Sequence, residues 1–193
     1  GYCLLQSLHQ HLDPSLLPYH RDHNYFFRST SKGASIARAV CLDTEPKVIH
    51  DVTSQAISSG KWHYDDKSVA YRHGGAGNNW ALGYQMCSGE FIETALNCIQ
   101  RELEQIDVPP SILVIHSIGG GTGSGLGTHL TEELTDHFTR ITRVNLAIMP
   151  YHFGEVVVQS YNALLCLSKI ASQAHAVLLF ENEVYPYITL LVT

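Results

Sequence analysis

Residues 119–125 (Gly-Gly-Gly-Thr-Gly-Ser-Gly), here named the glycine loop, carry the clearest chemical signal in this sequence. Glycine has no Cβ, so its backbone N–H groups can approach phosphate oxygens closely. A helix that begins at such a loop adds unpaired N–H groups and the positive end of its dipole. We therefore predict a phosphate-binding loop, with the hydroxyls of Thr122 and Ser124 as extra donors. Its members are Gly119, Gly120, Gly121, Thr122, Gly123, Ser124 and Gly125.

The glycine loop differs from two common nucleotide-binding motifs. A P-loop ends in Gly-Lys-Ser or Gly-Lys-Thr, and no lysine follows this loop. A dinucleotide-binding fold has its Gly-x-Gly-x-x-Gly after the first strand, and an acidic residue about 20 residues further on. Here the loop comes late in the order of elements, and Glu132 and Glu133 follow it too closely. A nicotinamide-dependent enzyme is therefore kept only as the weaker alternative.

Two carboxylates, Asp43 and Glu45, follow an apolar segment that has the character of a strand. Carboxylates beside a phosphate would repel it unless a hard cation lay between them, which points to Mg²⁺. The alternative is an ordinary helix start, with Asp43 or Thr44 as the N-cap and Glu45 favoured by the helix dipole. The residue pattern leaves both interpretations open.

Residues 76–79 (Ala76, Gly77, Asn78 and Asn79), here named the asparagine turn, precede Trp80. Their backbone and amide groups are suited to donate hydrogen bonds to a terminal phosphate. Glycine and asparagine are equally typical of a plain turn, with the tryptophan packed beneath it. These two interpretations also stay open.

Strands and helices alternate along the chain. Apolar runs predict strands at 36–42, 111–118, 144–149 and 176–180. Three- and four-residue periodicity and start signals predict helices at 2–8, 46–58, 90–106, 124–137 and 156–171. This order predicts an α/β fold with a Rossmann-like, mostly parallel sheet and helices on both faces.

Composition excludes several other classes of protein. A net charge of −6 without a long basic run argues against nucleic-acid binding. No apolar stretch approaches the length of about 20 residues that a membrane helix needs, so no membrane insertion is expected. The 5 cysteines are unevenly spaced, which argues against a disulfide framework.

Several segments, taken in order, resemble the tubulin family. They are residues 38–46 (Arg-Ala-Val-Cys-Leu-Asp-Thr-Glu-Pro), the asparagine turn with Trp80, the glycine loop, residues 155–162 and residues 181–183 (Glu-Asn-Glu). The resemblance extends over residues 36–185. Residues 154–162 (Gly-Glu-Val-Val-Val-Gln-Ser-Tyr-Asn) are most similar to the delta-tubulins, with the zeta-tubulins as the near alternative.

The resemblance implies a tubulin/FtsZ-type GTP-binding domain over residues 1–185, truncated at both ends and lacking its first strand, with a divergent tail at 186–193. It also implies bound GTP or GDP with Mg²⁺, and contacts with other tubulin subunits and with microtubule or centriolar proteins. The expected location is the cytoplasm and cytoskeleton, and the centriole or basal body for a delta-like member. Tubulins take the activating acidic residue from the next subunit, so no catalytic residue is expected in this chain.

The resemblance also assigns roles to single residues. Asp43 and Glu45 would face Mg²⁺, the asparagine turn would close over the γ-phosphate, and Asn182 would read the guanine edge. Glu155 and Gln159 stand where alpha- and beta-tubulins have an aspartate and a glutamate on the ribose side. This departure motivates a second hypothesis, a scaffold that binds GTP without hydrolysing it.

Overall fold

The computed structural model describes residues 2–11, 25–29, 35–107, 110–151, 156–181 and 188–192. The chain divides into two compact units. The first comprises residues 1–73 and 94–105, and the second comprises residues 74–93 and 106–193. Both units mix helices with sheets that contain parallel strand pairs, which confirms the predicted α/β class.

The first unit contains short strands and helices. The strands are β1 (Phe27–Ser29), β2 (Ser35–Ala37), β3 (Cys41–Asp43), β4 (Trp62–Tyr64) and β5 (Val69–Tyr71). The helices are α1 (Tyr2–His11), α3 (Pro46–Ser58) and most of α5 (Glu90–Leu103), with a 3₁₀ turn, η1 (Asp66–Ser68), between β4 and β5. One sheet has the order β1-β2-β4, and β3 pairs with β5 in parallel. Phe27, Trp62 and Tyr64 are buried in its core.

The prediction of a single strand at 36–42 was wrong. The structure has two strands there, β2 and β3, separated by Arg38, Ala39 and Val40. β2 pairs with β4 and β3 pairs with β5, so the two strands belong to different sheets. An apolar run shows that a segment is buried, but it does not show where the pairing partner changes.

Two helices of the first half agree with their predicted positions. α3 begins at Pro46, where the missing N–H of proline has no cost, and it ends at Ser58 as expected. α5 begins at Glu90, and the predicted apolar face is buried at Ile92, Ala95, Leu96 and Ile99. It ends at Leu103, earlier than the predicted end at residue 106.

The second unit is a sheet with helices packed against it. Its strands are β6 (Ser111–Ser117), β7 (Thr142–Ile148), β8 (Ala176–Phe180) and β9 (Ile188–Val192), in the order β6-β7-β8-β9. Its helices are α4 (Trp80–Met86), α6 (Gly127–His137) and α7 (Gln159–Gln173), and a π-helical turn, η2 (Thr122–Leu126), leads into α6. The β6–β7 and β7–β8 pairs are parallel, and β9 runs antiparallel to β8.

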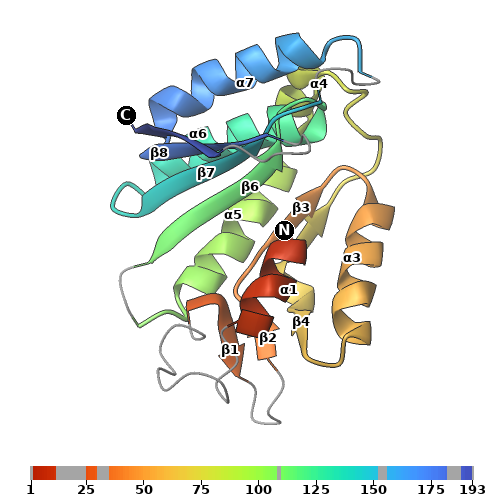
Figure 1. The fold of residues 1–193 in the computed structure, drawn as a ribbon, viewed down its shortest axis with the longest axis vertical. Coiled ribbons are helices and arrows are strands. Elements are labelled where there is room, and N and C mark those ends of the chain that lie inside the picture. The colour runs from red at the N-terminus through yellow and green to blue at the C-terminus, as the bar shows by residue number, and fades with distance from the viewer. Residues whose placement is uncertain are drawn as a thin grey trace. The chain divides into compact units, whose positions relative to one another are not determined.

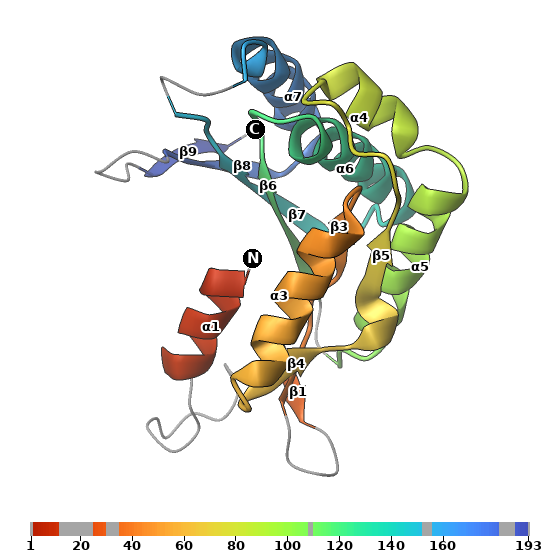
Figure 2. The same cartoon turned by 90° about the vertical axis from the view of Figure 1, so that its right-hand side faces the viewer.

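α6 and α7 lie side by side against one face of this sheet, as Figures 1 and 2 both show. Burial alternates along β7, where Arg143, Asn145 and Ala147 are buried and the residues between them are partly exposed. Ile118 follows β6, and it is buried in an apolar cluster with Ala147, Ala163, Cys166, Ile170, Ala174 and Val177. This core holds the end of β6, and therefore the start of the glycine loop, against α7.

β6 and β9 are the two edge strands of the sheet, and only β6 differs from the sequence prediction. The continuous apolar run predicted a buried strand at 111–118, but β6 forms one end of the sheet and Leu113 is 43% exposed. At the other end, β9 pairs in register with β8, from Ile188 opposite Phe180 to Val192 opposite Ala176. Residues 188–192 of the expected tail therefore add a strand to this sheet.

Candidate functional site

The glycine loop connects the carboxyl end of β6 to a continuous helical segment. That segment starts with the π-helical turn η2 at Thr122 and continues as α6 from Gly127. The predicted start at residue 124 was therefore slightly late. π-Helical turns within helices are frequent at functional sites. The loop thus lies at the helix start and strand end where α/β sheets bind ligands.

Most backbone N–H groups of the glycine loop have no hydrogen-bond acceptor among the residues that the structure describes. The Gly125 amide donates to the Gly121 carbonyl at 2.8 Å, as the first bond of the helix. Within the described part of the chain, the amides of Gly120, Gly121, Gly123 and Ser124 donate to no group. The first amides of a helix have no partner inside the helix. They form a set of donors suited to an anion.

The Ser124 side chain differs from its predicted role. It is fully buried, and its hydroxyl donates to the Gly120 carbonyl one helical turn back. We predicted this hydroxyl as a donor to a phosphate, but in the structure its proton is donated to the loop's own backbone. The backbone amide of Ser124, rather than its hydroxyl, is left for a ligand.

α4 packs directly on the glycine loop, backbone against backbone. A Cβ on Gly83 would lie 2.2 Å from the Gly121 carbonyl oxygen, and a Cβ on Gly121 would lie 2.6 Å from the Ala76 carbonyl oxygen and from the Asn79 nitrogen. Real Cβ atoms do not approach backbone that closely. Glycine is therefore required here by close packing within the protein, in addition to any ligand.

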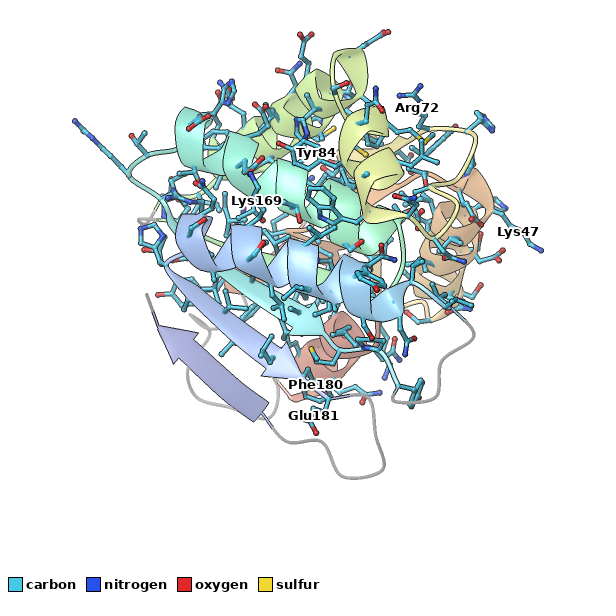
Figure 3. The ribbon with its side chains drawn as sticks, turned by 90° about the horizontal axis from the view of Figure 1, so that it is seen from above. Lys47, Arg72, Tyr84, Lys169, Phe180 and Glu181 are labelled. Atoms are coloured by element: carbon cyan, nitrogen blue, oxygen red, sulfur yellow. The ribbon has the colours of Figure 1, made fainter. Side chains whose placement is uncertain are left out.

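Side-chain contacts fix α4 on the helical segment that follows the loop. The Trp80 indole N–H donates to Thr128 at 3.1 Å, and its ring stacks on Tyr84. The Tyr84 hydroxyl donates to Glu132, whose other oxygen lies 3.2 Å from the Lys169 ammonium of α7. Figure 3 labels Tyr84 and Lys169. The bond to Glu132 raises the pKa of Tyr84 to about 12, so the phenol stays protonated at neutral pH and continues to donate.

The asparagine turn closes with a hydrogen bond from the Asn79 amide to the Ala76 carbonyl, at 2.9 Å. Its two central residues, Gly77 and Asn78, both have positive φ angles, 53° and 52°, as in a type I′ turn. The Asn79 side chain caps α4 by accepting from the Ala81 and Leu82 amides. The expected turn with a packed Trp80 is therefore present, and a role at the terminal phosphate stays a prediction.

Asn162 in the first turns of α7 is a site residue that sequence reasoning missed. Its amide bonds to the backbone of the glycine loop, of the asparagine turn and of Trp80. It occupies the buried face of α7 together with Ala163, Cys166 and Ile170. A polar residue at an apolar position of a helix is the signal that would have marked it.

Gln159 lies three residues before Asn162, at the start of α7. It is half-buried, and its side-chain amide donates to the Tyr151 carbonyl at 2.7 Å. The glycine loop, the asparagine turn and α7 with Gln159 all belong to the second unit. Glu155 and Asn182, the other two predicted nucleotide contacts, lie outside the described residues.

Asp43 and Glu45 belong to the first unit. The Asp43 carboxylate oxygen Oδ1 accepts from the Thr44 amide at 2.7 Å and from the Glu45 amide at 3.1 Å. Burial raises the pKa of Asp43, and these two amides oppose the shift. The N-cap of α3 is Glu45, with no side-chain cap bond, so the expectation that Asp43 or Thr44 is the N-cap was wrong.

Among the residues that the structure describes, no three His, Cys, Asp or Glu side chains come together as a metal site. No helix in the same ranges is long and apolar enough to cross a membrane.

Comparison with known proteins identifies the family. The sequence model described as "Tubulin/FtsZ family, GTPase domain" matches residues 2–188. This chain belongs to the Tubulin/FtsZ family. It is 43% identical to the tubulin delta chain of Canis lupus familiaris and 42% identical to that of Mus musculus, over 158 residues that make up 82% of this chain and 35% of each relative. Identity to the tubulin beta-1 chain of Chondrus crispus is 35% over 159 residues, with similar coverage. The chain therefore spans about a third of the length of these relatives.

A buried histidine lies beneath the glycine loop of this tubulin-family chain. His116 of β6 is hydrogen-bonded through Nδ1 to the Gly123 carbonyl at 2.9 Å, and its Nε2 is buried without a partner in the described residues. Burial lowers the pKa of His116 below its ordinary value, although hydrogen bonds to Gly123 and Ser117 oppose the shift. The folded protein therefore holds this ring neutral.

We expect His116 to make the second unit less stable in acid. Because its pKa is lower in the folded than in the unfolded chain, the unfolded chain binds the proton first as pH falls below about 6.5. Its contribution is present above that pH and is lost below it, with a slope of at most about 1.4 kcal/mol per pH unit. Denaturant unfolding at pH 7.5 and 5.5 should show a smaller loss in His116→Asn, whose side chain cannot titrate. Equal losses in the two proteins would contradict the assignment.

Proposed function

We propose that this chain is the nucleotide-binding part of a tubulin and that its glycine loop binds the phosphates of GTP or GDP. The observation that carries the proposal is the set of amides at Gly120, Gly121, Gly123 and Ser124, at the start of a helical segment, which donate to no group in the described ranges of the chain. Such amides and the helix dipole favour an anion. The match to a family whose domain is described as a GTPase supports guanine as the base.

The proposed contacts to the γ-phosphate, the ribose and the guanine follow from the sequence resemblance to tubulins. The asparagine turn would close over the γ-phosphate, Glu155 and Gln159 would bond the ribose, and Asn182 would read the guanine. Hydrolysis would be phosphoryl transfer to water, completed by an acidic group of a neighbouring subunit.

Asp43 and Glu45 would hold the Mg²⁺ that accompanies the nucleotide. Asp43 fits this role because its carboxylate is half-buried and its second oxygen has no hydrogen-bond partner in the described residues. A divalent cation beside that oxygen would lower the raised pKa of Asp43 and neutralise the negative charge of its carboxylate.

We further propose a delta-like tubulin that assembles with other tubulin subunits in microtubule-based structures of the cytoplasm, such as the centriole or basal body. The higher identity to delta chains, 43% against 35% for a beta chain, supports this assignment. The exposed apolar residues on α7, which include Tyr161 and Leu164, are consistent with a protein that contacts partners.

Displacement of a fluorescent GTP analogue from the full-length protein tests the proposed ligand. We expect GTP and GDP to displace the analogue and NAD to leave it bound. Chelation of Mg²⁺ by EDTA should lower the affinity for GTP more than the affinity for GDP. Displacement by NAD but not by GDP would instead support a nicotinamide-dependent enzyme. Failure of the analogue to bind would refute the proposal.

A scaffold that binds GTP without hydrolysing it is the second candidate. It is favoured by Gln159, whose neutral amide is already engaged with the Tyr151 carbonyl and stands where other tubulins have an acid. Single-turnover hydrolysis, measured on the full-length protein with and without polymerising tubulin partners, separates the two. Phosphate release only with partners supports a GTPase, and no release in either sample supports a scaffold.

A further inference from the structure

Asn162 joins three backbone segments with a single side chain. Its Nδ2 donates to the Asn78 carbonyl at 2.8 Å and to the Gly119 carbonyl at 2.9 Å, and its Oδ1 accepts from the Trp80 amide at 2.9 Å. The side chain is nearly inaccessible, with Asn162 only 3% exposed. Water does not reach this side chain, so Asn162 supplies the hydrogen bonds that the three backbone groups would otherwise make with water.

Only an amide side chain of this length meets these requirements. The three partners are two carbonyls and one N–H, so they demand two donors and one acceptor at fixed positions. They also fix which end of the amide carries the nitrogen. Aspartate would present acceptors to two carbonyl oxygens, and an apolar residue would leave all three groups unpaired.

The arrangement ties the asparagine turn to the glycine loop. The Asn78 carbonyl and the Trp80 amide lie on either side of Asn79, so one side chain holds both ends of that residue. The Gly119 carbonyl is the first of the glycine loop. A displacement of either segment toward or away from a ligand must stretch a bond to Asn162, and so is communicated to the other segment and to α7.

We propose that Asn162 is a positioning residue that keeps the asparagine turn closed on the glycine loop and thereby sets the preference for GTP over GDP. The inference rests on the proposed function, in which the glycine loop serves both nucleotides and the asparagine turn serves the γ-phosphate. Loosening the asparagine turn therefore lowers the affinity for GTP more than the affinity for GDP. A residue needed only for folding would change the two affinities together.

The test compares Asn162→Asp with Asn97→Asp in the full-length protein, by calorimetric titration with GTP and with GDP. Asn97 is an exposed residue of α5, so it controls for the change of amide to carboxylate. Asn162→Asp removes both hydrogen bonds that Nδ2 donates. We expect it to lower the affinity for GTP about tenfold and the affinity for GDP by no more than about threefold. Asn97→Asp should leave the ratio of the two affinities unchanged.

Equal weakening of both nucleotides, or no weakening, would overturn the role of Asn162 while leaving the proposed function intact. Absence of guanine-nucleotide binding in the unmodified protein would overturn the proposed function itself, and this inference with it. If Asn162→Asp does not fold, hydrogen exchange of the Trp80 amide in the unmodified protein decides the question. Its protection should be greater with GTP than with GDP, and equal protection would refute the proposal.

Discussion

Replacing Gly121 by alanine is expected to lower the free energy of unfolding by about 3 kcal/mol, the upper end of the range for overpacking a tight site. The added Cβ would lie 2.6 Å from the Ala76 carbonyl oxygen and from the Asn79 nitrogen, which are backbone atoms that cannot rotate away. The asparagine turn would have to move off the glycine loop. We also expect GTP affinity to fall at least about tenfold, because the donors would no longer be held together.

Gly120 provides a matched control for this substitution. Its added Cβ would meet only the Asn78 side-chain oxygen, at 3.8 Å, which is an ordinary contact. Gly120→Ala should therefore unfold like the unmodified protein, and any loss of GTP affinity in it reports on the ligand alone. Thermal unfolding of both variants, each with and without GTP, makes the comparison. Equal stability of Gly121→Ala and Gly120→Ala would show that the close packing is not a constraint.

Replacing Arg28 by methionine is expected to destabilise the first unit by about 2–3 kcal/mol. This is less than the cost of about 3–5 kcal/mol for breaking a fully buried ion pair, because the Arg28 side chain is 21% exposed. The Arg28 guanidinium contacts the Asp65 carboxylate, and it lies 3.6 Å from the Glu102 carboxylate. Glu102 is 6% exposed, with one oxygen bonded to Ser68 and the other without a partner in the described residues. Without Arg28, a negative charge would stay buried and uncompensated.

Two companion variants test this explanation. Arg101→Met removes an exposed arginine that donates to the Lys67 carbonyl and also helps to lower the pKa of Asp65, so we expect a smaller loss, of no more than about 1 kcal/mol. The double variant Arg28→Met with Glu102→Gln removes the charge along with its partner, and it should recover part of the lost stability. Urea unfolding gives the three values. An Arg28→Met loss no larger than that of Arg101→Met would contradict the buried charge as its cause.

Local periodicity was sufficient to predict several elements of the fold. The apolar residues of α5, the proline start of α3 and the five-residue strand β8 were predicted with correct or nearly correct bounds. These features depend on residues close in sequence. The break at Arg38–Val40 was missed because it depends on two strands, β4 and β5, that come later in the chain.

The candidate site shows the same division. Sequence located the glycine loop between a strand and a helix, and it located the asparagine turn before α4. It did not reveal that the Ser124 hydroxyl donates its hydrogen bond to the Gly120 carbonyl. Nor did it reveal Asn162, because a polar residue on a helix gives no indication of which distant backbone it meets.

The sequence alone thus determined which groups could contact a ligand. They are a run of backbone donors at a helix start, with carboxylates and amides elsewhere in the chain. Tertiary structure decided which of those groups are already engaged. Hydrogen bonds saturate and act over about 3 Å, so the state of each donor depends on neighbours that sequence spacing does not reveal. The bonds of Asn162 to Gly119 and Asn78, 43 and 84 residues away along the chain, were settled only by folding.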